Sequence, residues 1–376
     1  MLFDLQPKTK REDLYDRENE LSEFKEALKL GERLVLLLGI RRLGKSSLLN
    51  VALSESEHPH AKIDVRSMYF THGSVPQEIL TKRILSSLIG SLPSSGKLRL
   101  GIVEALSSIR GVRLSGVHVE FEKKPDLAEI LEKIDSWAGN EGRRVIIGFD
   151  EAQYLRLSGI QYDGLIAYVV DNLPNLTLVL TGSEVGVLHE FLGLENPRKP
   201  LFGRYAREIV LERFTRSESI EFLEKGFEEL GVTVSSEELE RVVDRLDGIV
   251  GWLSTYGYLR GVRKLPEKNA LEELFRRAEA LVMDELSSLL SHSRRYWFIL
   301  KAVSLGNSRW SSIKEYVEFK TGRINDAKFS HLLKNLVKYG YLEKTAEGYS
   351  IPDPVVLEVI RKSQLKPRQV TSPWTS

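Results

Sequence analysis

The sequence predicts a three-layer α/β fold on a parallel five-stranded sheet, followed by an all-helical lid and a small helical domain with a β-hairpin. Short apolar runs alternate with helical segments through the first 212 residues, and the first run leads into a glycine-rich loop. After Phe214 the pattern changes to helices alone. We therefore expect domains at residues 1–212, 213–290 and 291–362, with a flexible tail at 363–376.

The central motif is Gly39–Ser46, G-I-R-R-L-G-K-S, directly after the apolar run Leu34–Leu38. It matches G-x-x-x-x-G-K-[ST], in which glycines let the backbone N–H groups point inward and a helix directs its positive end at bound phosphates. We expect the Lys45 ammonium to contact the β- and γ-phosphates and the Ser46 hydroxyl to bind Mg²⁺. The residues expected to bind nucleotide here are Gly39, Ile40, Arg41, Arg42, Leu43, Gly44, Lys45, Ser46 and Ser47.

The second motif is the run Arg144–Glu151, R-V-I-I-G-F-D-E, an apolar segment that ends in two acids. A buried strand delivers such carboxylates to the carboxyl edge of a parallel sheet. We expect Asp150 to hold Mg²⁺, mostly through its water, and Glu151 to polarise the water that attacks the γ-phosphate. The alternative is that the two acids are solvated and only cap the next helix.

A third apolar run, Leu176–Ser183, ends in small hydroxyls. Thr181 and Ser183 are candidates for sensing the γ-phosphate, although hydroxyls at strand ends also serve as helix caps. Arg204 precedes a fifth short strand and is either a further contact of the γ-phosphate or a solvated surface charge. Arg204 could act within its own chain or on a neighbouring copy.

The rest of the chain is predicted to be helical, with helices at Ser217–Leu230, Ser235–Leu246, Val250–Arg260 and Glu267–Leu290. From near Ser293, three helices and a hairpin that turns at Ala346–Gly348 indicate a winged helix. The outward face of its third helix carries Lys328, His331, Lys334 and Lys338. This face could enter the major groove of DNA, but lysine-rich faces are often only solvated, and many winged helices bind proteins.

Composition narrows the possible functions. The absence of cysteine excludes disulfides, a thiol nucleophile and cysteine-ligated metal sites. No apolar stretch reaches the length of a membrane span, and the first residues lack a signal-peptide core, so we expect a cytoplasmic protein with no membrane partner. The net charge of +1 hides an asymmetry, because Ser291–Ser376 has 15 Lys and Arg against 7 Asp and Glu, which is +8 and leaves −7 elsewhere.

Taken together, these stretches resemble the archaeal ATPase family, in the signal-transduction (STAND-like) branch of the AAA+ P-loop proteins. The resemblance extends from about Asp13 through the winged helix. Its motifs are G-I-R-R-L-G-K-S-S-L-L, F-D-E-A-Q at 149–153, L-T-G-S at 180–183 and P-L-F-G-R at 200–204.

The resemblance implies ATP and ADP as the nucleotides. It also implies that the segment L-Y-D-R-E-N-E-L lies near adenine, through Leu14, Tyr15 and Arg17. Two positions depart from the family pattern. Asp16 stands where glycine is frequent, and Val250 stands in place of the proline of a lid motif that contacts nucleotide.

The expected function is therefore an ATP-binding, slowly hydrolysing, Mg²⁺-dependent ATPase that acts as a nucleotide-controlled switch. Its winged helix would contact a protein partner or DNA. The alternative is a DNA-binding ATPase that resembles origin-recognition proteins. A nucleotide-dependent kinase is disfavoured, because the chain has the Asp150-Glu151 pair and lacks an arginine-rich kinase lid.

Overall fold

In the computed structural model, which describes residues 1–124 and 126–364, five parallel strands form one sheet in the order β2-β5-β6-β1-β7. The strands are β1 (Leu34–Leu38), β2 (His60–Asp64), β5 (Val145–Asp150), β6 (Leu176–Gly182) and β7 (Arg207–Val210). Strands β1, β5 and β6 are buried along their whole length, as expected for a sheet covered on both faces. The predicted three-layer α/β fold is confirmed.

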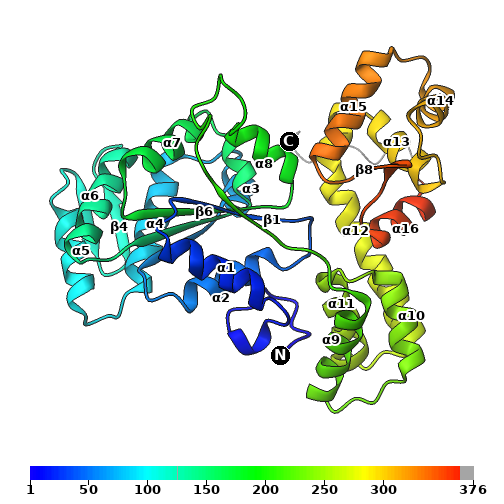
Figure 1. Ribbon diagram of the computed structural model, residues 1–376, viewed down its shortest axis with the longest axis horizontal. Helices are drawn as coiled ribbons and strands as arrows, with labels where there is room; N and C mark the ends of the chain where they lie inside the picture. Colours follow the sequence, from blue (N-terminus) through cyan, green and yellow to red (C-terminus); the bar gives the residue numbers. More distant parts are fainter. Residues whose placement is uncertain (125, 365–376) are drawn as a thin grey trace. The chain divides into compact units, whose positions relative to one another are not determined.

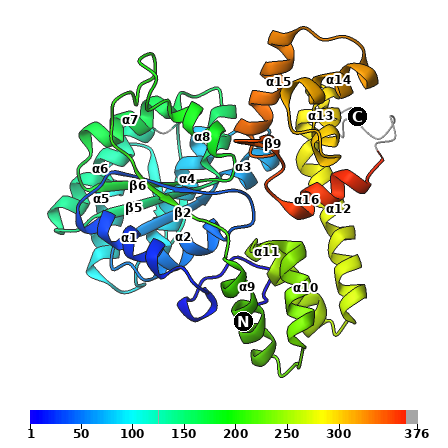
Figure 2. The ribbon, with the colours of Figure 1, turned by 45° about the vertical axis from the view of Figure 1, so that its right-hand side comes forward.

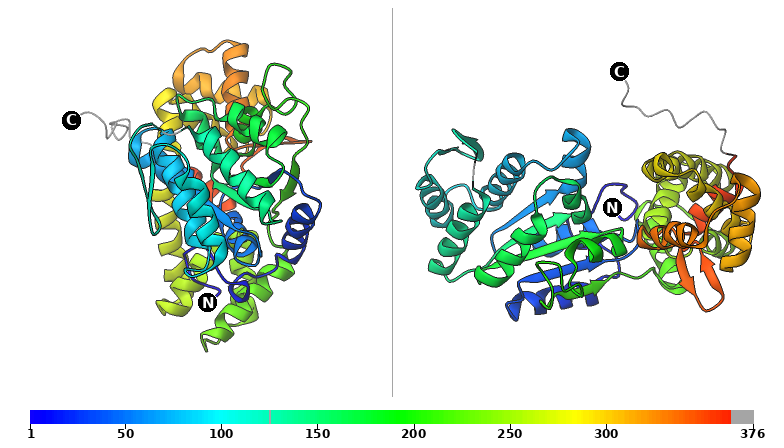
Figure 3. Two further views of the ribbon diagram at one scale, coloured as in Figure 1. Left: turned by 90° about the vertical axis from the view of Figure 1, so that its left-hand side faces the viewer. Right: turned by 90° about the horizontal axis from the view of Figure 1, so that it is seen from above.

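Helices cover both faces of this sheet. Helices α1 and α2 lie on one face, and α6 and α7 lie on the other (Figure 1). The helices of this part are η1 (Arg11–Asp13), α1 (Glu18–Lys29), α2 (Lys45–Ser54), α3 (Val65–His72), α4 (Gln77–Ser91), α5 (Lys97–Ser107), α6 (Leu127–Asn140), η2 (Ala152–Leu157), α7 (Tyr162–Asn172) and α8 (Val185–Leu192). A hairpin of β3 (Val112–Ser115) with β4 (His118–Phe121) lies apart from the main sheet (Figure 3).

The edge strand β2 is protected by a helix. Its outward N–H groups at His60 and Lys62 donate to the hydroxyls of Ser91 (3.2 Å) and Ser87 (2.9 Å) on α4. Covered in this way, the edge cannot pair with a strand of another molecule. Strand β2 ends at Asp64, because Asp64 caps α3 by accepting a hydrogen bond from the Ser67 N–H at 2.8 Å.

The chain divides into two units. The first unit is Pro7–Leu211, and the second is Met1–Gln6 together with the chain from Glu212 onward. The prediction groups residues 1–6 with residues 7–212, whereas in the structure residues 1–6 belong to the second unit. Phe3 is fully buried in the second unit, where its ring packs edge-on against Phe222 and Phe227.

The second unit is helical apart from one hairpin. Its elements are α9 (Arg216–Glu229), α10 (Ser236–Leu246), α11 (Val250–Gly257), the π-helical turn η3 (Tyr258–Val262), α12 (Glu267–His292), α13 (Arg295–Ser304), α14 (Trp310–Thr321), α15 (Asp326–Lys338), β8 (Glu343–Thr345), β9 (Gly348–Ser350) and α16 (Pro354–Lys362). Figure 2 shows α12, in yellow, running from α9–α11 to the winged helix.

Two contacts join the lid helices to the last helix. The Trp252 indole of α11 donates to the Asp353 carboxylate, the N-cap of α16, at 2.9 Å, and Arg245 of α10 pairs with Glu358 of α16 at 2.7 Å. These contacts connect the lid to the winged helix within the second unit. Residues 365–376 of the predicted tail lie outside the described residues, and among the helices that the structure describes none is long and apolar enough to cross a membrane.

Candidate nucleotide site

The predicted phosphate loop connects β1 to α2, and Lys45 is the first residue of that helix. Gly39 has a φ of +142°, and a Cβ atom there would lie 2.7 Å from the Leu211 carbonyl oxygen, so the tight turn requires glycine. The Lys45 ammonium donates to the carbonyl oxygens of Gly39 (2.7 Å) and Ile40 (2.6 Å). The loop therefore curls around a buried positive charge, at the N-terminus of a helix.

The electrostatic surroundings of Lys45 favour an anion. Burial lowers the pKa of Lys45 to about 8, although the charges of Glu151 and Asp150 act in the opposite direction. The positive form is thus costly in the protein alone and would be stabilised by phosphate oxygens placed beside it. This is the electrostatic behaviour expected of a phosphate-binding lysine.

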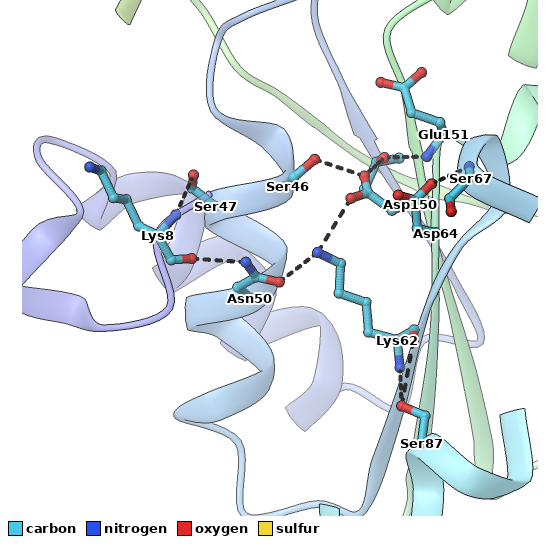
Figure 4. A network of polar contacts seen from close by, with 11 residues as sticks. Lys8, Ser46, Ser47, Asn50, Lys62, Asp64, Ser67, Ser87, Asp150 and Glu151 are labelled. Carbon is cyan, nitrogen blue, oxygen red and sulfur yellow. Dashed lines mark hydrogen bonds and ion pairs between the residues drawn. The ribbon is translucent and has the colours of Figure 1, made fainter. Parts of the chain in front are cut away.

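Asp150 lies at the carboxyl end of β5 and is buried. Its Oδ1 atom accepts hydrogen bonds from the Ser46 hydroxyl (3.0 Å) and from the Thr181 hydroxyl (2.6 Å). Figure 4 shows Ser46 and Asp150 pointing toward each other. A hydroxyl and a carboxylate are ligands that suit Mg²⁺. Thr181 is fully buried and gives its only proton to Asp150, so in this structure it positions the carboxylate.

Few protein groups are available for a metal at this edge. Within residues 1–124 and 126–364, no group of three or more His, Asp or Glu side chains is arranged to hold a metal ion. Magnesium is commonly bound by one or two carboxylates and completes its shell with substrate phosphates and water. The pair of Ser46 and Asp150 beside a phosphate loop fits that mode.

Glu151 follows Asp150 where the chain leaves the sheet. It has a φ of 56°, in the left-handed region that is costly for a residue with a side chain. Its carboxylate accepts hydrogen bonds from the Ser183 hydroxyl (2.6 Å) and the Gln153 amide (2.5 Å). The turn separates it from Asp150, so the two adjacent acids have different partners.

An ion pair between the phosphate loop and the segment after β6 was not predicted. Arg41 pairs with Glu184, which directly follows Ser183 at the end of β6, at 2.6 Å. Burial raises the pKa of Glu184, while the charge of Arg41 opposes this shift. No local pattern marks Glu184, because its role depends on β6 lying beside β1.

The segment expected near adenine lies against the phosphate loop. Arg17 is buried and directs its guanidinium to the Leu43 carbonyl oxygen (3.4 Å) and to Glu20 (2.8 Å). Asp16 has a φ of 48°, which explains why glycine suits this position. The burial of the other predicted nucleotide contacts differs: Leu14 and Leu43 are buried, whereas Tyr15, Arg41 and Arg42 are half-buried. The Ser47 hydroxyl accepts a hydrogen bond from the Lys8 N–H.

Arg204 is not brought to the phosphate loop of its own chain. It lies before β7, whose first residue pairs with Val35 near the start of β1, and it is bound to Asp171 at 2.7 Å. This is the amino edge of the sheet, whereas the phosphate loop leaves the carboxyl end of β1. At about 3.3 Å per residue, the five residues of β1 separate the two edges by roughly 15 Å.

Two further sets of predicted residues lie in the second unit. Val250 is the first residue of α11. On α15, the side chains of Lys328, His331 and Lys334 are exposed and Lys338 is half-buried. The hairpin β8–β9 projects beside the helices of this winged helix (Figure 3).

Residues 14–255 match a family profile described as an ATPase domain predominantly from Archaea. Residues 290–351 match the C-terminal winged helix-turn-helix domain of MCM proteins. The chain is similar to a solved Walker-type ATPase of Pyrococcus abyssi, with 39% identity over 96% of this chain and 100% of that chain, and a TM-score of 0.83.

A more distant similarity concerns the fold alone. The ORC2 protein of Aeropyrum pernix, solved as ADPNP and ADP complexes, has 14% identity over 96% of each chain and a TM-score of 0.59. Among curated proteins, no match was found.

Proposed function

The chain belongs to the family of ATPase domains found predominantly in Archaea, and on this premise we propose that it is a slow, Mg²⁺-dependent ATPase that acts as a nucleotide-controlled switch. The observation that carries the proposal is the convergence of Lys45, Ser46 and Asp150 at one edge of the sheet. Lys45 would hold the β- and γ-phosphates of ATP. Ser46 and Asp150 would hold Mg²⁺, which supplies positive charge against the phosphates when bound.

Glu151 is proposed as the residue that orients the attacking water and accepts its proton. Its carboxylate is engaged by Ser183 and Gln153. Both donors contact Oε2, so they fix the orientation of the carboxylate, and Oε1 would be the oxygen that faces the water. Through this bond Ser183 would sense the state of the site by way of the orientation of Glu151.

The switch proposal is supported by the contacts of one short helix. Helix α11 begins at Val250, the proposed lid contact, and two residues later Trp252 donates to Asp353 of the winged-helix domain. A displacement at the start of α11 would therefore be passed directly to α16. The Arg245–Glu358 pair adds a second connection between the same two parts.

For Arg204 we propose a role at the γ-phosphate only in an assembly. Its own phosphate loop lies at the opposite edge of the sheet, so a neighbouring copy would have to supply the nucleotide. The bond to Asp171 would hold the guanidinium in place until such a contact forms.

A direct test measures phosphate release from ATP by the full chain, with Mg²⁺ and with EDTA. We expect turnover well below the ~10 s⁻¹ of a typical enzyme, and none in EDTA. Mass spectrometry of the purified protein should detect retained ADP, because slow exchange accompanies a switch. Equal turnover in EDTA, or a protein that binds no adenine nucleotide in either condition, would rule out the proposal.

A second candidate function is DNA binding by the winged helix. It is favoured by the exposed face of Lys328, His331 and Lys334, and by the positive charge of this end of the chain. These side chains could neutralise phosphates while α15 lies in the major groove. ATP hydrolysis and DNA binding would then belong to one protein, as in the alternative that the sequence suggested.

Salt dependence of duplex binding tests this second function. Each phosphate neutralised contributes about −0.9 to the slope of log affinity against log salt. We expect the double variant K328A/K334A to reduce the magnitude of that slope by roughly 1.8 in a gel-shift titration. The matched control K225A/K268A, on α9 and α12, should leave the slope unchanged. A parent protein with no salt-dependent shift would remove DNA as a partner.

A further inference from the structure

Lys62 of β2 reaches the carboxylate that is proposed to hold Mg²⁺. Its ammonium lies 3.3 Å from Asp150 Oδ2 and 2.5 Å from the Asn50 side-chain oxygen. Figure 4 shows the Lys62 side chain extending between α2 and β5 to meet both partners. The positive charge of Lys62 therefore lies beside one oxygen of Asp150, the predicted metal ligand.

The sheet register explains why Lys62 can do this. Lys62 pairs with Gly148 on β5, and Asp150 lies two residues further along the same face. This step is about 7 Å, which a lysine side chain can span. The backbone of Lys62 is held from the other side by Ser87 of α4, at 2.9 Å.

Asn50 fixes the end of the lysine. It lies on α2 one turn after Ser46, and its side-chain amide donates to the Lys8 carbonyl oxygen at 2.9 Å. That bond turns the amide oxygen toward Lys62. The ammonium is therefore tethered between Asn50 and Asp150, and it does not rest on the carboxylate alone.

The two oxygens of Asp150 have separate partners. Ser46 and Thr181 donate to Oδ1, whereas Lys62 faces Oδ2. Thr181 is fully buried, so its hold on the carboxylate does not depend on the lysine. Removing the charge of Lys62 should leave Asp150 correctly oriented. Lys62 therefore supplies positive charge beside Asp150, and the orientation of the carboxylate does not depend on it.

We propose that Lys62 is a built-in counter-ion of Asp150 that weakens the binding of a divalent cation at this site. The inference rests on the proposed function, since it assumes that Asp150 is a metal ligand. An ammonium and a divalent cation that share one carboxylate repel each other, which lowers the affinity for the metal. When the metal and nucleotide leave, the same ammonium supplies positive charge beside a buried carboxylate whose Oδ1 is contacted by neutral hydroxyls.

The test measures Mn²⁺, as a spectroscopic substitute for Mg²⁺, bound to the full chain saturated with ADP. Free Mn²⁺ is followed by electron paramagnetic resonance, with K45A as the baseline for Mn²⁺ bound by ADP in solution. We expect K62Q and K62M each to bind Mn²⁺ about tenfold more tightly than the parent. K62R, which keeps the charge, and K82Q, on the exposed side of α4, should match the parent.

The outcomes separate this inference from the proposed function. A parent protein that binds no Mn²⁺ above the K45A baseline would contradict the metal site itself. Parent binding that K62Q and K62M leave unchanged or weaken would overturn only the role of Lys62. As a second measurement, K62M should melt below K62R in EDTA, and this difference should shrink with Mn²⁺ and ADP. Equal melting in EDTA would also contradict the counter-ion role.

Discussion

Replacement of Glu151 by glutamine is expected to lower ATP turnover by about 10²–10⁴-fold while ATP binding stays close to that of the parent. Glutamine keeps the size of the side chain but cannot accept a proton from the attacking water. The phosphates and Mg²⁺ would still be held by Lys45, Ser46 and Asp150. Single-turnover phosphate release would measure the chemical step, and calorimetric titration with a non-hydrolysable ATP analogue would measure binding.

The hydrogen bonds of Glu151 indicate that the E151Q variant keeps its local structure. Glu151 contacts Ser183 and Gln153, so an amide at this position can still bond to the Ser183 hydroxyl and preserve the strained turn. E195Q, at an exposed glutamate of the same unit, is the matched control and should retain the parent rate. Hydrolysis by E151Q at the parent rate would show that another group activates the water.

The phosphate loop and the acidic strand end were predictable because each is a local pattern. Gly39–Ser46 and Arg144–Glu151 carry their chemistry within eight residues, and an apolar run marks the strand before or within each. Helix α2 begins at Lys45, as the motif predicts. A short motif with a required backbone shape thus fixes local structure and chemistry together.

Partners that depend on strand order were not predictable. Lys62 looks like an ordinary exposed lysine of a strand until β2 is known to lie beside β5 with Lys62 opposite Gly148. The pairing of Arg41 with Glu184 likewise requires β6 to lie beside β1. No pattern in a single sequence gives such order, because it is decided by packing between distant segments.

Helices near turn-rich segments were also missed. Helix α3 begins directly after β2, at Val65, where the run A-K-I-D-V-R at residues 61–66 suggests that the strand continues. The cap at Asp64 and the buried side chains of Val65 and Met68 override that weak local preference. Helix α5, which follows the turn-rich segment Pro93–Gly96, was not among the predicted helices.

Substitution of Lys45 by alanine is expected to abolish measurable ATP binding. Charge-assisted hydrogen bonds contribute ~1.5–3 kcal/mol each, so losing two contacts to the phosphates lowers affinity by roughly 10²-fold or more. In the parent, the buried ammonium donates hydrogen bonds to the carbonyl oxygens of Gly39 and Ile40. These bonds hold the positive charge inside the loop before a phosphate binds. Calorimetric titration of parent and variant with ATP would measure the loss.

The fold of K45A should survive, because burial of the charged lysine is costly in the free protein and lowers its pKa to about 8. Unchanged melting without nucleotide, together with the loss of the stabilisation that ATP gives the parent, would assign the effect to binding. K97A, at the N-terminus of α5, is a control lysine outside the phosphate loop. If K45A bound ATP within threefold of the parent, the loop around Lys45 would not be the nucleotide site, and the roles assigned to Asp150 and Glu151 would lose their basis.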